Sequence, residues 1–110
     1  MNELIIIKTT VKNKVTKENI INELIKNDYV SCINVIENVS SHYKWQGKVE
    51  NEKEDILFIK TMKRNEKLVY EVIRAIHDYE TPEIVTIAVN NIDSSYDKNN
   101  ILNHIRKLRI

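Results

Sequence analysis

Four side chains in this sequence carry donor atoms that copper prefers. They are the thiol of Cys32 and the imidazoles of His42, His77 and His104. Thiolate and imidazole are common copper ligands, so a copper site is one function that these residue types allow. A lone cysteine among β-branched residues more often packs as a small buried apolar side chain, and we expect this of Cys32. We expect His42 at an interface or in solvent, and His104 at the surface of a helix.

A second group of candidates consists of charged side chains on the predicted strands and beside them. Its members are Lys48, Glu50, Lys60 and Glu83. Charges of both signs near the buried ends of strands need partners, and two interpretations stay open. The four side chains form a structural ion-pair network, or they line a pocket that suits a small anion or zwitterion better than a bare metal ion. We expect the acidic run at residues 50–55 to be a solvated loop.

The composition argues against several classes of function. The 110 residues carry a formal net charge of +1, which gives no general attraction to nucleic acid or anionic lipid. Residues 55–60, the predicted third strand, lack the glycine and the pair of stacking aromatics of an RNA-recognition module. A single glycine, Gly47, cannot build a phosphate-binding loop, and no nucleophile and base follow from the spacing. We therefore expect no enzyme, no nucleic-acid partner and no membrane partner.

The apolar pattern predicts the elements that position these side chains. Short β-branched runs predict strands at residues 4–10, 29–36, 41–45, 56–61 and 84–89. Apolar stripes at helical spacing predict three helices. The first is capped by Thr16, the second opens at Asn65, and the third begins at about Ser95 and carries Ile101, Leu102, Ile105 and Leu108.

A long hairpin is expected between the second and third strands. Gln46 and Gly47 predict its tight turn, because glycine accepts a positive φ, and an irregularity is expected just after residue 36. Tyr43 and Trp45 are two residues apart, so they share one face of the hairpin. Two short helices cannot cover large aromatics on a projecting hairpin, so we expect these two side chains at a subunit interface.

The order of elements is β-α-β-β-α-β with an added C-terminal helix. This order predicts an α+β fold, the ferredoxin-like sandwich, as a single domain over residues 1–110. Right-handed crossovers place the first two helices on one face of an antiparallel sheet. The opposite face then needs a cover, either the last helix or other subunits. A single cysteine and the lack of a signal-peptide pattern at the first residues predict the cytoplasm.

Five short motifs follow one another along the chain. The most specific is S-H-Y-K-W-Q-G-K-V-E at residues 41–50, and the others are K-T-T-V, S-C-I-N-V, I-K-T and H-D-Y-E-T-P-E-I. The first closely resembles the hairpin signature S-x-Y-x-W-x-G-K-x-E of the CutA family of divalent-cation tolerance proteins. The other four agree with that family in order and spacing, so the resemblance extends from the first strand to the last.

The resemblance implies a homotrimer in which the hairpins pair edge to edge between subunits, with clefts at the subunit boundaries. The residues expected at such a cleft are Tyr43, Trp45, Lys48, Glu50, Lys60, Tyr79 and Glu83. It also implies binding of copper or another divalent cation. The places of the family's three copper ligands fall here on Thr9, Ile76 and His77, so His77 alone is retained and we expect weak binding. The other role open to His77 is to hold the helix-to-strand turn by hydrogen bonds.

The resemblance leaves a second function open. The trimeric PII signalling proteins share the ferredoxin-like architecture and bind small ligands in intersubunit clefts. In a regulatory protein of that kind, Lys48 and Lys60 would contact an organic ligand, whereas in a metal-tolerance protein His77 would contact a cation.

Overall fold

The apolar run near the start of the chain forms β1 (Leu4–Val11), a central strand of a four-stranded antiparallel sheet. This computed structural model describes residues 3–96. β1 pairs with β3 (Lys48–Met62) and β4 (Ile84–Ala88), and β2 (Cys32–Trp45) pairs with the outer side of β3. The order β2-β3-β1-β4, with one helix after β1 and one after β3, is ferredoxin-like, which confirms the predicted fold.

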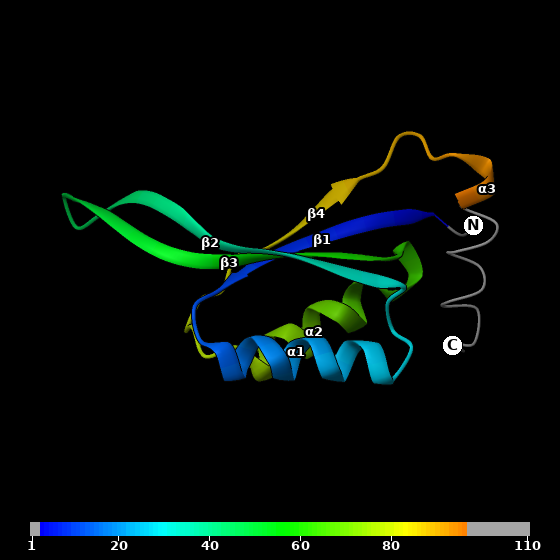
Figure 1. Cartoon of the computed structure of the whole chain (residues 1–110), viewed down its shortest axis with the longest axis horizontal. Helices are drawn as coiled ribbons and strands as arrows, with labels where there is room; N and C mark the ends of the chain where they lie inside the picture. The colour runs from blue at the N-terminus through cyan, green and yellow to red at the C-terminus, as the bar shows by residue number, and fades with distance from the viewer. Residues whose placement is uncertain (1–2, 97–110) are drawn as a thin grey trace.

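Two helices cover one face of the sheet, as Figure 1 shows. They are α1 (Lys14–Lys26) and α2 (Glu66–Ile76), and the 3-10 turn η1 (Lys63–Asn65) leads into α2. Their apolar stripes pack on alternate side chains of the strands, and the buried core consists of Ile5, Ile7, Val11, Ile20, Leu24, Val30, Leu57, Ile59, Val69 and Ile73. Within residues 3–96, no helix has the length and apolar character needed to cross a membrane.

The start of α1 differs from the prediction in its cap. The side-chain oxygen of Asn13 accepts a hydrogen bond from the backbone N–H of Thr16 at 3.0 Å. The prediction that Thr16 caps the helix is therefore wrong. Asparagine is at least as good a capping residue as threonine, so the helix begins nearly one turn earlier, and the Thr16 side chain is buried.

The face of the sheet opposite the helices is apolar and partly exposed. Ile36, Val85 and Ile87 lie on this open face and are 48%, 42% and 41% exposed. Cys32 pairs with Lys60 and so lies on the open face as well, where it is half-buried. The expectation that Cys32 packs in the core is wrong, because the strand register turns it away from the helices.

The chain enters its predicted last helix as α3 (Ser94–Tyr96). The other residues of the predicted helix lie outside the described residues, among them Ile101, Leu102, His104, Ile105 and Leu108. Tyr96 and Ile92 pack beside Met62 and Leu4 at one end of the sheet.

The hairpin formed by β2 and β3 projects beyond the helices (Figure 1). Trp45 pairs with Lys48, and Gln46 and Gly47 between them have φ values of 51° and 81°, as a type I′ turn requires. The ladder changes register between Ile36 and Val39, so the predicted turn and irregularity are both confirmed. The prediction of a loop at residues 50–55 is wrong, because pairing with β2 makes this acidic run part of β3.

Candidate functional site

The His77 side chain lies in the turn between α2 and β4 and is fully buried. Its Nδ1 accepts a hydrogen bond from the backbone N–H of Tyr79 at 3.1 Å. The ring must therefore be the neutral tautomer with hydrogen on Nε2, which lies 2.8 Å from the carbonyl oxygen of Thr10 and donates to it. The ring also contacts the Tyr79 ring at a centroid distance of 4.4 Å. These contacts fix the end of α2 to the end of β1.

A metal ion could bind His77 only by breaking one of these two backbone hydrogen bonds. The freed backbone group would be left buried without a partner, which costs about 1–3 kcal/mol. Among residues 3–96, no three His, Cys, Asp or Glu side chains are grouped so that they could hold a metal ion. The arrangement of His77 therefore matches the turn-holding role better than the ligand role.

Two adjoining surface pockets lie where the α2–β4 turn meets the hairpin. Their volumes are about 440 and 510 Å³, and both are lined by Tyr43, Glu52, Tyr79 and Thr81. The first also includes Glu54, Glu83 and His42, and the second includes Trp45 and Lys12. Of the residues expected at a cleft, the structure thus brings Tyr43, Trp45, Tyr79 and Glu83 to these pockets.

The first pocket is acidic, and its charges are partly paired. The Tyr79 hydroxyl donates a 2.7 Å hydrogen bond to Glu54. Burial, and then this carboxylate, raise the pKa of Tyr79 far above its ordinary value. Glu52 lies 3.3 Å from Lys12, and Glu83 lies 3.0 Å from Lys8. A neutral tyrosine beside anionic carboxylates favours a cation or a hydrogen-bond donor in this pocket, rather than the small anion that the sequence suggested.

The remaining predicted residues lie at opposite ends of β3. Lys48 and Glu50 pair with Trp45 and Tyr43 near the tip of the hairpin, so these four side chains share one face. Lys60 is twelve residues farther along the strand, roughly 40 Å away at ~3.3 Å per residue. Its Nζ lies 3.3 Å from the Tyr96 hydroxyl and 5.5 Å from the centre of that ring. Within one chain, Lys48 and Lys60 therefore cannot contact the same ligand.

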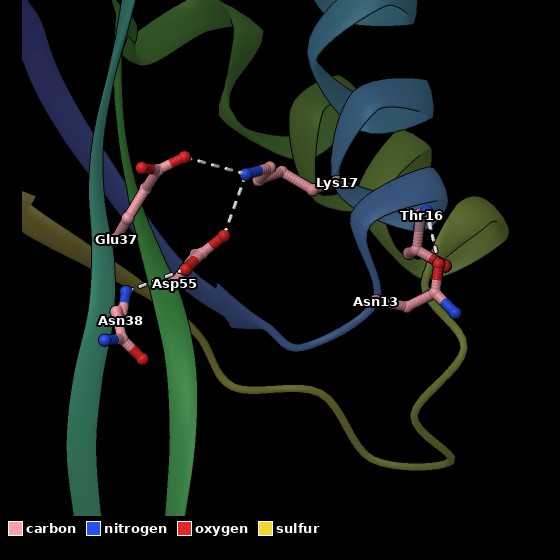
Figure 2. A network of polar contacts seen from close by, with 6 residues as sticks. All are labelled: Asn13, Thr16, Lys17, Glu37, Asn38 and Asp55. Atoms are coloured by element: carbon pink, nitrogen blue, oxygen red, sulfur yellow. Dashed lines mark hydrogen bonds and ion pairs between the residues drawn. The ribbon is translucent and has the colours of Figure 1, made fainter.

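A polar network that the sequence did not predict lies at the base of the hairpin, as Figure 2 shows. Lys17 of α1 contacts Asp55 of β3 at 2.8 Å and Glu37 of β2 at 3.4 Å. The other oxygen of Asp55 accepts a hydrogen bond from the backbone N–H of Asn38 at 2.9 Å. The hydrogen bond between Lys17 and Asp55 is the largest cause of the raised pKa of Lys17 and of the lowered pKa of Asp55.

The fold and the hairpin together define a class: small α+β proteins of the ferredoxin-like type with one open sheet face and a long projecting hairpin. Within this class the chain belongs to the CutA1 divalent ion tolerance protein family, whose model matches residues 5–99. This match confirms the family that the five motifs predicted.

Individual relatives agree with this membership. The chain is 33% identical to the divalent-cation tolerance protein CutA of Thermotoga maritima, over 84% of this chain and 91% of that protein. It is 27% identical to the chloroplastic CutA protein of Arabidopsis thaliana over 84% of this chain, and it spans 50% of that longer protein. Its structure is similar to the crystal structure of CutA1 from Ehrlichia chaffeensis, with a TM-score of 0.82, 28% identity and coverage of 89% of this chain and 92% of that one.

Proposed function

We propose that this protein works as a homotrimer in divalent-cation tolerance and is not an enzyme. The observation that carries the proposal is the exposure of its projecting aromatics and its open sheet face: Trp45 is 61% exposed and Tyr43 is 41% exposed. Apolar side chains exposed on both the sheet and the hairpin favour burial against other copies of the chain. The family to which the chain belongs supplies the process, divalent ion tolerance.

Copper binding in this proposal is weak. His77 is the single retained ligand position of the resemblance, and both of its ring nitrogens bind backbone groups. Other ligands would have to come from carboxylates such as Glu80 or Glu83, from water, or from a neighbouring subunit. Carboxylate oxygens suit hard cations better than copper, so selectivity for Cu²⁺ is expected to be low.

A second candidate function is regulation by a small organic ligand bound in clefts between subunits. The two pockets at the α2–β4 turn favour it, because volumes of about 440 and 510 Å³ fall in the range of small-molecule sites. Their aromatic and carboxylate lining suits a ligand with an apolar body and a cationic group.

Calorimetry of the purified protein separates the two candidates. The titrants are Cu²⁺, Zn²⁺ and a panel of nucleotides, amino acids and organic amines. The cation candidate predicts binding of both metals at micromolar or weaker affinity and no heat with the organic panel. Saturable binding of an organic compound, lost in Tyr79→Ala and without metal binding, supports the second candidate instead.

We propose a reducing compartment, the cytoplasm, as the working location. Cys32 is the chain's lone cysteine and has no partner for an internal disulfide, which fits a compartment that keeps thiols reduced. Cell fractionation with an antibody to the protein tests this proposal, and recovery in a membrane or secreted fraction would contradict it.

A further inference from the structure

The direction of the long hairpin is set at one irregular position, the bulge at Glu37 and Asn38. Here two residues of β2 lie opposite Asp55 of β3, and pairing resumes at Val39 and Glu54. Asn38 has a φ of 62°, the left-handed region that asparagine tolerates better than most residues. A bulge bends a strand and increases its local twist, so this bulge sets the direction of the hairpin arm beyond it.

A cation from a different element holds this bulge in place. Lys17 in the first turns of α1 reaches across to Asp55 and Glu37, and its side chain is only 12% exposed. Asp55 in turn accepts from the backbone N–H of Asn38, the residue with the left-handed conformation. The chain of contacts therefore runs from the helix layer through one carboxylate to the backbone of the bulge (Figure 2).

A small change at the bulge would be magnified at the tip. Seven residue pairs lie beyond it, from Val39 and Glu54 to Trp45 and Lys48. This arm is roughly 23 Å long at ~3.3 Å per residue, so a bend of ~10° moves the tip by about 4 Å. Interfaces are packed as closely as protein interiors, and a shift of this size separates Tyr43 and Trp45 from any fixed contact surface.

We propose that Lys17 and Asp55 are positioning residues for assembly: their ion pair locks the bulge and thereby aims the hairpin at the neighbouring subunit. This inference rests on the proposed trimer. Lys17 and Asp55 lie outside the subunit interface but hold the hairpin in the direction that the interface requires. The pair sets the direction of the hairpin and does not itself contact the neighbouring subunit. Both side chains lie between α1 and the base of the hairpin, and not on the face that carries Tyr43 and Trp45.

The test compares matched variants by sedimentation velocity over a dilution series. Lys17→Met removes the cation, and Asp55→Asn removes the charge but keeps an oxygen for Asn38. Asp55→Ala removes both. Lys63→Met is the control, because Lys63 makes an ion pair of the same 2.8 Å length with Glu66, away from the hairpin. We expect Lys17→Met and Asp55→Asn to raise the concentration for half-dissociation at least about tenfold, Asp55→Ala to raise it further, and Lys63→Met and Lys17→Arg to leave it near the parent value.

Hydrogen exchange separates positioning from general support of the fold. In Asp55→Ala the amides of β1 should lose only the protection that the drop in global stability removes, while the amide of Asn38 should lose clearly more. Equal loss of protection in β1 would mean that the pair stabilises the whole domain, and this would overturn the positioning role. A trimeric parent whose Lys17→Met and Asp55→Asn variants assemble as well as Lys63→Met would overturn the inference alone. A monomeric parent would overturn the proposed trimer and this inference with it.

Discussion

Histidine is a common metal ligand, but the surroundings of His77 give its side chain a structural role. Its ring joins the Thr10 carbonyl to the Tyr79 amide from a fully buried position. The sequence could predict both roles because histidine serves either, but it could not choose between them. The choice depends on which backbone groups face the ring, and one of them, the Thr10 carbonyl, is 67 residues from His77 in the chain.

Replacing His77 by alanine should therefore cost stability rather than metal binding. Two buried backbone groups lose their partner, so we expect the free energy of unfolding to fall by about 2–4 kcal/mol. Urea denaturation at fixed protein concentration measures this change. His42→Ala, at an exposed position, is the control. Loss of Cu²⁺ binding with an unchanged urea midpoint would identify His77 as a ligand and contradict the structural role.

Asp55 gives a prediction that depends on pH. Its pKa in the folded state is lowered by Lys17 and by the Asn38 amide, so the ionised form stabilises the fold. This stabilisation is fully present above about pH 5 and is lost as the pH falls through the lowered pKa. We expect Asp55→Asn to be about 1–3 kcal/mol less stable than the parent at pH 7. The difference in free energy of unfolding between the variant and the parent should narrow toward zero near pH 2. Urea titrations at pH 7 and pH 2 measure it, and a difference that does not change with pH would contradict the ion pair.

At the scale of elements, apolar periodicity was sufficient for most of the fold. β1, α2 and β4 lie close to their predicted positions because each carries an unbroken apolar run or stripe. The acidic part of β3 was missed, because residues 50–55 have charged or polar side chains on both faces and show no apolar alternation. What makes it a strand is pairing with β2, which the tight turn imposes. Pairing the residues of the two strands one by one, starting from the turn at Gly47, would have predicted this part of β3. It would also have placed Glu50, Glu52 and Glu54 on the face of Tyr43 and Trp45.

The hairpin turn offers a direct test of this element. Gly47 has a φ of 81°, and a Cβ added there would meet no atom within 4 Å, so any penalty is one of backbone conformation alone. We expect Gly47→Ala to lower the free energy of unfolding by about 1 kcal/mol, and Gln46→Asn to raise it by about 0.5 kcal/mol, since asparagine tolerates positive φ better. Urea midpoints measure both changes. Equal stability of all three proteins would mean that the turn is not type I′ in solution.

At the scale of the whole molecule, a single chain leaves surface that a monomer would rarely expose. The sequence predicted the reason in outline: two short helices can cover only one face of the sheet. It could not predict the pockets or the network at Lys17, because both depend on the spatial meeting of α1, the bulge and the α2–β4 turn. Such long-range contacts leave no periodic signal in the chain.

Replacing Trp45 tests whether the hairpin forms part of the interface between subunits. Truncating a large aromatic that becomes buried on assembly costs about 3–5 kcal/mol, so Trp45→Ala should shift the protein toward smaller species at micromolar concentration. Val49→Ala is the matched control, because Val49 is exposed on the other face of the same hairpin. Sedimentation velocity reports both variants. Equal assembly of Trp45→Ala, Val49→Ala and the parent would place Trp45 on the free surface.

The mass of the parent protein in solution shows whether this chain forms the proposed trimer. Light scattering coupled to size exclusion, at micromolar concentration and neutral pH, should give about 39 kDa, three times the 13.0 kDa mass of the chain. A single species near 13 kDa at that concentration would rule out the trimer, because the open sheet face and the hairpin aromatics would then have no partner among copies of the chain.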